Sequence, residues 1–275
     1  MPSLDKAKKV AIANEKGGVG KTVVTMQCAH AAVDAGYRAL YVEADPQGNA
    51  TLALTEFDID TPPPVSLADV IDRNTDAELM DAVIPTEREG LYLLSAGFDE
   101  LQAVQDGLIG KPGAENSIKR ALKAADGTFD FVFLDTRPAR DLITRNAFMA
   151  ADAVMIVVQP ERFSSSGLNG TLRVIAELRE YLDKELPMAG WVVNMIDGRR
   201  ADHAEHVEFL RQRAIQEGTT ILAELAHNAD LSKLTISGMG LSEHNRPTAR
   251  IRSFAQDFDK IIERLLESVP EGVSA

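Results

Sequence analysis

Cysteine and long apolar runs are scarce in this chain, and both shortages exclude classes of protein. Cys28 is the one cysteine among 275 residues, so the chain forms no internal disulfide and no zinc site built on several cysteines. Its apolar runs fall short of the roughly 18 residues expected of a transmembrane helix, so we expect no membrane span. The N-terminal residues lack the apolar core of a signal peptide, and we therefore expect a cytoplasmic protein.

Basic residues are outnumbered as well. The chain has 29 Lys and Arg against 42 Asp and Glu, a net charge of −13, which argues against a uniformly basic surface but allows a local basic patch. Acidic residues are concentrated between Glu56 and Glu89, whereas the stretch from Arg246 to Arg252 has three arginines and no acid. The length suits one large domain or two small ones. We expect a single domain over residues 1–275, without an N-terminal helix-turn-helix domain, because the first strand begins near Val10.

Short apolar runs alternate with helical segments along the chain. The runs are continuous, which is typical of strands buried on both faces of a parallel sheet. They cover residues 10–13, 39–42, 91–94, 129–134, 153–158 and 191–193, with a weaker candidate at 221–222. Helices are expected over residues 22–35, 114–125, 166–182, 201–217 and 251–266. This alternation predicts an α/β fold with a doubly wound, mostly parallel sheet flanked by helices.

A glycine-rich segment, Glu15 to Thr22, follows the first expected strand and opens the first expected helix. That context is required of a phosphate-binding loop, in which glycines let backbone N–H groups approach a polyphosphate and the helix N-terminus adds its dipole. Lys21 is expected to reach the β- and γ-phosphates, and Thr22 to ligate Mg²⁺. A glycine-rich turn without a ligand is the alternative. The residues expected to bind the nucleotide here are Gly17, Gly18, Val19, Gly20, Lys21, Thr22 and Val23.

The loop departs from the general phosphate-loop pattern in one way: Glu15 stands where a glycine is usual, and Lys16 precedes the double glycine. In this form it resembles the deviant Walker A motif of the ParA/MinD family of ATPases. The resemblance implies ATP and Mg²⁺ as cofactors and an ATP-dependent sandwich homodimer, in which Lys16 of each subunit contacts the ATP of the other. A cation at this place can neutralise charge on the transferring phosphoryl group.

A second motif, Tyr41 to Thr51, follows the second expected strand. It is similar to the ParA segment that has two aspartates before Pro-Gln-Gly-Asn, although a turn alone could explain the Pro-Gln-Gly-Asn residues. The resemblance implies that Asp45 orients the attacking water, so that Lys16, Lys21 and Asp45 form the catalytic set. Glu43 replaces the first aspartate of the family pattern, a change that could alter Mg²⁺ contacts.

A third motif is the apolar strand that ends in Asp135. At the carboxyl edge of a parallel sheet this carboxylate would face the nucleotide, and it matches the Walker B acid that holds Mg²⁺, although apolar strands ending in Asp are common. Arg137 stands where the family has a proline, and contact with phosphate, contact with a partner and simple exposure remain open. Asn194 ends another strand. In related ATPases such an asparagine hydrogen-bonds the adenine; a strand-end turn is the alternative.

ParA proteins bind DNA non-specifically as ATP dimers, which requires Lys and Arg contacts to phosphates. By resemblance Arg199 is the first candidate and Arg200 the second, whereas His227 occupies a position where many relatives have arginine. Arg246, Arg250 and Arg252 could supply further positive charge for DNA phosphates. Alternatively, these three arginines could simply lie on a solvated face of a helix. The C-terminal segment 254–266 has mixed charge rather than a basic face, so membrane binding is not expected.

The resemblance implies a nucleoid-associated ATPase with slow, partner-stimulated hydrolysis. It would drive the partition of plasmid or chromosome DNA together with a ParB-like, centromere-binding partner. Two alternatives remain open. The same engine could position a protein cargo, or the chain could be a metabolic ligase of the same fold, although its sequence offers no second catalytic cluster.

Overall fold

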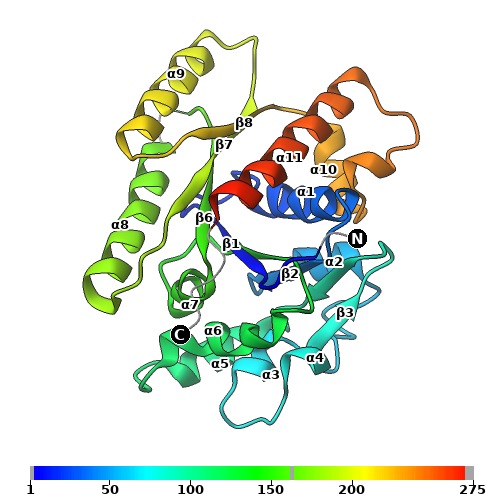
Figure 1. Ribbon diagram of the computed structural model, residues 1–275, viewed down its shortest axis with the longest axis vertical. Coiled ribbons are helices and arrows are strands. Elements are labelled where there is room, and N and C mark those ends of the chain that lie inside the picture. The colour runs from blue at the N-terminus through cyan, green and yellow to red at the C-terminus, as the bar shows by residue number, and fades with distance from the viewer. Residues whose placement is uncertain (1–2, 162–163, 270–275) are drawn as a thin grey trace.

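An eight-stranded sheet runs through the computed structural model, which describes residues 3–161 and 164–269 (Figure 1). The strand order is β3-β4-β2-β5-β1-β6-β7-β8. Among the described strands β3 pairs antiparallel with β4, and the other pairings are parallel. The strands are β1 (Lys8–Ala13), β2 (Ala39–Ala44), β3 (Val83–Pro85), β4 (Leu91–Leu94), β5 (Phe131–Thr136), β6 (Ala153–Val158), β7 (Met188–Ile196) and β8 (Ile221–Ala226). The prediction of a doubly wound, mostly parallel sheet is confirmed.

Helices cover both faces of this sheet. On one face lie α1 (Lys21–Asp34), α2 (Asn49–Leu54), α10 (Ala229–Ile236) and α11 (Ala249–Ser268), and Figure 1 shows α11 beside α1. On the other lie α3 (Leu67–Ile71), α4 (Leu79–Ala82), α5 (Asp99–Leu108), α6 (Ser117–Ala121), α7 (Leu142–Ala150), α8 (Ser164–Leu182) and α9 (Ala201–Gln216). Because both faces are covered, every residue of β2, β5 and β6 is buried, which explains their continuous apolar sequence.

The structure adds elements that the apolar pattern did not predict, namely α2 to α5, α7, α10 and the short edge strand β3. The helix expected over residues 114–125 is broken into a 3₁₀ turn (Ala114–Asn116), α6 and a second 3₁₀ turn (Leu122–Ala125). A third 3₁₀ turn (Leu241–Glu243) precedes α11. Within the part of the chain that the structure describes, no helix combines the length and the apolar character needed to cross a bilayer.

Candidate nucleotide site

The glycine-rich loop connects the end of β1 to the start of α1, as expected. Gly18 and Gly20 have φ of 74° and 91°, which are values that residues with a side chain rarely adopt. A Cβ at Gly20 would also collide with the amide group of Asn194. The loop therefore needs glycine at position 20 for both its backbone conformation and its packing.

A cavity of about 570 Å³ opens over this loop. Three segments surround it: the loop itself, the connection after β2 and the connection after β5. The lining residues are Gly17, Gly18, Gly20, Lys21, Thr22, Val23, Asp45, Pro46, Gln47, Asn49, Thr136, Arg137, Pro138 and Ala139. The carboxyl ends of neighbouring parallel strands thus meet at one cavity, the place where this class of sheet binds ligands.

Lys21 is the buried cation of the cavity. The residue is only 7% exposed, and its Nζ donates a hydrogen bond to the Asn14 carbonyl at 3.0 Å. Burial lowers the pKa of Lys21, while the carboxylates of Asp135 and Asp45 act in the opposite direction. An anionic phosphate entering the cavity would restore charge compensation to this ammonium group.

Asp135 lies beneath Thr22 and is buried together with Tyr41 and Thr25, while Thr22 itself is half-buried at the cavity. Its Oδ2 accepts hydrogen bonds from the hydroxyls of Thr22 and Tyr41, each at 2.7 Å, and Thr25 Oγ1 lies 3.5 Å from Oδ1. Burial raises the pKa of Asp135 to about 6, despite the opposing effect of these hydrogen bonds. The described residues include no cluster of three or more His, Cys, Asp or Glu suited to a metal. A hydroxyl and a carboxylate fit Mg²⁺ whose remaining ligands are phosphate and water.

Asp45 lines the same cavity and is half-buried. Its Oδ1 accepts a hydrogen bond from the backbone N–H of Gln47 at 3.1 Å, which fixes the turn after β2. A side chain on Gly48 would collide with the Phe98 ring, so this turn also packs tightly from below. The placement leaves a carboxylate at the cavity wall; its role in orienting water stays a prediction.

Glu43 belongs to β2, and its carboxylate contacts the start of α2 rather than the cavity wall. Its Oε1 accepts from the Ala50 N–H at 2.6 Å and the Thr51 N–H at 3.3 Å, and its Oε2 accepts from the Thr51 hydroxyl at 2.5 Å. Burial raises its pKa to about 7. The structure therefore gives Glu43 a role in holding the N-terminus of α2, while the register of β2 and β5 sets its backbone opposite that of Asp135.

Lys16 is tied to its own chain. Its Nζ donates to Glu161 Oε2 at 2.5 Å and to Gln159 Oε1 at 3.2 Å, and its side chain is 27% exposed. Gln159 also donates to the Gly18 carbonyl at 2.9 Å, so the end of β6 directly supports the loop. A contact with a partner's nucleotide would require Lys16 to exchange the Glu161 carboxylate for phosphate.

Asn194 lies behind the loop. Its Nδ2 donates to the Val19 carbonyl at 2.9 Å, and its Oδ1 accepts from the Met195 N–H at 2.9 Å. The side chain is buried and helps to hold the loop conformation. This contact could not be read from the sequence, because it joins residues 175 positions apart. The adenine contact expected for Asn194 stays a prediction.

Arg137 is anchored at the cavity wall. Its Nη1 donates to Gln102 Oε1 at 2.8 Å, and it forms an ion pair with Asp141, which also caps α7. The side chain is 18% exposed, so the alternative of simple solvent exposure is wrong. Contact with phosphate and contact with a partner remain open.

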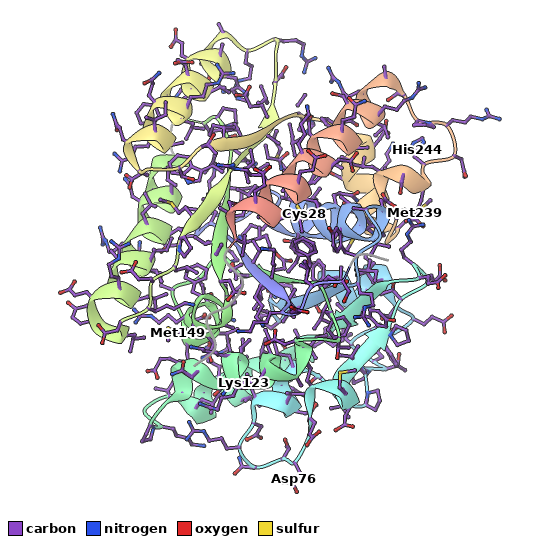
Figure 2. The ribbon with its side chains drawn as sticks, viewed as in Figure 1. Cys28, Asp76, Lys123, Met149, Met239 and His244 are labelled. Atoms are coloured by element: carbon purple, nitrogen blue, oxygen red, sulfur yellow. The ribbon has the colours of Figure 1, made fainter. Side chains whose placement is uncertain are left out.

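The arginines expected to bind DNA lie outside the cavity. Arg199 is 91% exposed and pairs with Asp197 through two hydrogen bonds of 3.0 and 2.9 Å, and Arg200 pairs with Asp202 in the same way. His227 is exposed as well. Exposed arginines at and before the start of α11 form the second group, next to the segment where Figure 2 labels His244: Arg246, Arg250 and Arg252.

Sequence reasoning missed the Tyr41 hydroxyl, which reaches Asp135 from within β2. The available signal was a phenol in a strand that otherwise consists of aliphatic residues up to Glu43. It also missed the supporting contact of Gln102 with Arg137, because the helix that carries Gln102, α5, was not predicted.

A glycine loop between a strand and a helix, with a buried lysine and a Thr–Asp pair beneath it, defines a P-loop nucleotide-binding protein. A family described as "AAA domain" matches residues 7–188. The chain is 33% identical over 194 residues to the sporulation initiation inhibitor protein Soj of Bacillus subtilis, covering 70% of this chain and 74% of that protein. It is 35% identical over 201 residues to the chromosome partitioning protein ParA of Caulobacter vibrioides, covering 72% and 73%. The chain belongs to the ParA/Soj family of ATPases.

Two solved structures are similar to this chain. Cobyrinic acid a,c-diamide synthase from Mycobacterium smegmatis, with bound ADP and magnesium, is 32% identical, with a TM-score of 0.69 and coverage of 75% of this chain and 82% of that one. An ATP complex of Cyanothece McdA has a TM-score of 0.83 at 21% identity, covering 98% and 100%, and supports the fold alone. The nucleotide and magnesium in the first structure agree with the cofactors expected from the sequence.

Proposed function

We propose that this chain is a partition ATPase that binds ATP and Mg²⁺, closes into a sandwich homodimer and binds DNA non-specifically. In this proposal a ParB-like partner stimulates slow hydrolysis and release, and the protein acts in the cytoplasm on the nucleoid. The observation that carries the proposal is the cavity that unites Lys21, Thr22 and Asp45 above Asp135, in a chain 35% identical to a chromosome partitioning ParA.

In the nucleotide-loaded chain, bound Mg²⁺ supplies charge neutralisation at the phosphates. Lys21 moves its donor from the Asn14 carbonyl to phosphate oxygen, and loop N–H groups hold the remaining oxygens. Thr22 and Asp135 would hold the ion. Asp45 accepts a hydrogen bond from the attacking water at the cavity wall and so aligns it with the γ-phosphate.

Dimerisation requires Lys16 to leave Glu161. The two side chains are 27% and 44% exposed, and an ion pair as exposed as this contributes about 0–1 kcal/mol. A triphosphate presented by a second copy carries more negative charge than one carboxylate and can replace Glu161. The ion pair therefore holds Lys16 near the cavity at little energetic cost to the exchange.

A metabolic ligase is the second candidate, and the 32% identity to cobyrinic acid a,c-diamide synthase favours it. A ligase would need a pocket for its own substrate next to the phosphates, whereas a partition ATPase needs ATP-dependent binding to duplex DNA. Positioning of a protein cargo would use the same ATPase cycle as partition, so only the identity of the partner separates those two functions.

The test is duplex DNA binding with ATP, ADP or no nucleotide across a salt series, with sedimentation to follow the oligomeric state. We expect a dimer and DNA binding with ATP alone, and affinity that falls steeply with salt. Lys16→Ala should bind ATP but stay monomeric, while the control Lys233→Ala, on an exposed face of α10, should behave as the unmodified protein. An ATP-loaded monomer that fails to bind DNA at low salt contradicts partition and favours the ligase.

A further inference from the structure

The hydroxyl of Tyr41 is a buried polar group that none of the three motifs explains. Tyr41 is completely buried in the middle of β2, where its ring packs in the apolar layer under α1. Phenylalanine would fill the same volume. The hydroxyl donates a 2.7 Å hydrogen bond to Asp135 Oδ2, so the group that distinguishes tyrosine from phenylalanine is used on the Walker B carboxylate.

Strand register brings the two residues together. Tyr41 of β2 lies opposite Phe133 of β5 in a parallel pairing, and Asp135 follows Phe133 by two residues. Since side chains alternate along a strand, Tyr41, Phe133 and Asp135 share the face under α1. The long axis of the phenol spans the distance from the level of Phe133 to the carboxylate. An aliphatic side chain at position 41 would end short of it.

The bond from Tyr41 differs in kind from the other short bond to the same oxygen. Thr22 also donates to Asp135 Oδ2 at 2.7 Å, but its hydroxyl lines the cavity and its oxygen is the group expected to ligate Mg²⁺, so the position of this hydroxyl depends on the ion. Tyr41 approaches from the strand beneath and makes no contact with the cavity, whose lining does not include it. Its bond can therefore persist through metal binding and release, and a bond to a carboxylate is among the stronger hydrogen bonds.

We propose that Tyr41 is a positioning residue for Mg²⁺, which fixes the Asp135 carboxylate in the orientation that receives the hydrated ion. The inference rests on the proposed nucleotide function. Groups that orient a metal-holding side chain typically change metal affinity by about 10–100-fold when removed. Because Asp135 keeps its Thr22 bond in the absence of Tyr41, we expect an effect at the lower end of that range.

The experiment is Tyr41→Phe, with binding of a fluorescent ATP analogue followed at increasing Mg²⁺ concentration. The half-saturating Mg²⁺ concentration should rise about tenfold, while affinity for the analogue in the presence of chelator should not change. Tyr37→Phe is the matched control, since Tyr37 packs edge-on against Phe131 in the same layer but is not part of the Asp135 cluster. Thermal denaturation of each variant establishes that it is folded.

A double-mutant cycle makes the test independent of general destabilisation. In an Asp135→Asn background, adding Tyr41→Phe should shift the Mg²⁺ requirement less than about twofold, because the residue acts through the carboxylate. An unchanged Mg²⁺ requirement in Tyr41→Phe, an equal loss of affinity with and without Mg²⁺, or full additivity in the cycle overturns the inference. Failure of the unmodified protein to bind the analogue at all would instead contradict the proposed function.

Discussion

Carboxylates at the nucleotide site and carboxylates between β7 and α9 have opposite pKa shifts, because the first are buried and the second are solvated. In the buried layer beneath the site, burial is the dominant influence, and it raises the pKa of Glu43 to about 7 and that of Asp135 to about 6. In the β7–α9 connection and the first turn of α9 the carboxylates are solvated, and hydrogen bonds from Arg199 and Arg200 lower the pKa of Asp197 and Asp202. The buried charges at the nucleotide site therefore need a bound ligand to neutralise them. The charges between β7 and α9 already neutralise one another as Arg–Asp pairs.

This difference sets the expected size of mutational effects. Charges in a buried site interact through a low effective dielectric constant, so removing one has large consequences. Solvated ion pairs contribute about 0–1 kcal/mol and weaken with salt. Substitutions in the cavity should therefore abolish ATP binding or hydrolysis. Substitutions in the β7–α9 connection should change DNA affinity only by a smaller factor.

The largest effect is expected from Lys21→Ala. The substitution removes the buried ammonium that faces the phosphates, and we expect ATP affinity to fall about 100-fold or more in equilibrium titration. Lys184→Ala is a matched control, because Lys184 is a partly buried lysine that donates to a backbone carbonyl, that of Ala151 at 2.6 Å, away from the cavity. Equal losses in the two variants would contradict a specific role for Lys21.

Asp45→Asn should separate binding from chemistry. The amide oxygen can keep the turn by accepting from the Gln47 N–H, while the charge that orients water is lost. We expect steady-state hydrolysis to fall about 100-fold, within the range for loss of a group that assists proton transfer, with ATP affinity unchanged. Asp60→Asn, in an exposed loop, is the control. A normal rate in Asp45→Asn would remove this residue from the mechanism.

The effect of burial on Glu43 can be tested through the pH dependence of stability. A pKa raised from 4.5 to about 7 means that the folded state holds a proton that the unfolded state has released, so stability decreases as pH rises from about 4.5 to 7. The full displacement corresponds to about 3 kcal/mol. Urea denaturation at pH 5 and pH 8 should show a smaller decrease in Glu43→Gln than in the unmodified protein. Asp135 contributes in the same direction to both proteins and cancels in the difference, so equal decreases would contradict the prediction.

Much of the cavity was predictable because its parts follow strands. Each of β1, β2 and β5 is a buried apolar run, and in a parallel sheet the residues that follow such runs meet at one edge. Lys21, Asp45 and Asp135 could therefore be placed together from the order of motifs alone. The sheet class followed from the same continuous runs.

Other features depend on contacts that no local pattern contains. The helix α3 has five residues, too few for a periodic signal, and it is fixed by the reciprocal bonds of Ser66 and Asp69. The bond from Tyr41 to Asp135 requires knowledge that β2 and β5 are neighbours and of their register. The pairing of Lys16 with Glu161 joins positions 145 residues apart. Contacts of this kind depend on the tertiary structure, and the sequence alone does not show which residues form them.

Glu161→Gln should have a moderate effect that favours the dimer. Removing the carboxylate frees Lys16 for a second nucleotide. An ion pair of this exposure limits the gain to about fivefold for each of the two subunits, and so to about 25-fold in dimer affinity with ATP. Sedimentation across protein concentration measures it. Glu185→Gln removes an exposed acid that pairs with Arg179 and should leave dimerisation unchanged. A weaker dimer in Glu161→Gln would mean that Glu161 supports the closed state instead.

The smallest effect is expected from Arg199→Ala. Each exposed arginine contributes about one phosphate contact and the dimer carries two copies of Arg199. DNA affinity should therefore fall about tenfold at low salt, and the slope of log affinity against log salt should decrease by about two units. Because Asp197 competes with DNA for this guanidinium, Asp197→Asn should have the opposite effect and strengthen binding. Arg179→Ala, at an exposed arginine of α8 that pairs with Glu185, should change neither quantity. If Arg199→Ala abolished binding outright, the β7–α9 connection would behave like the buried site, and the division between the two regions would not hold.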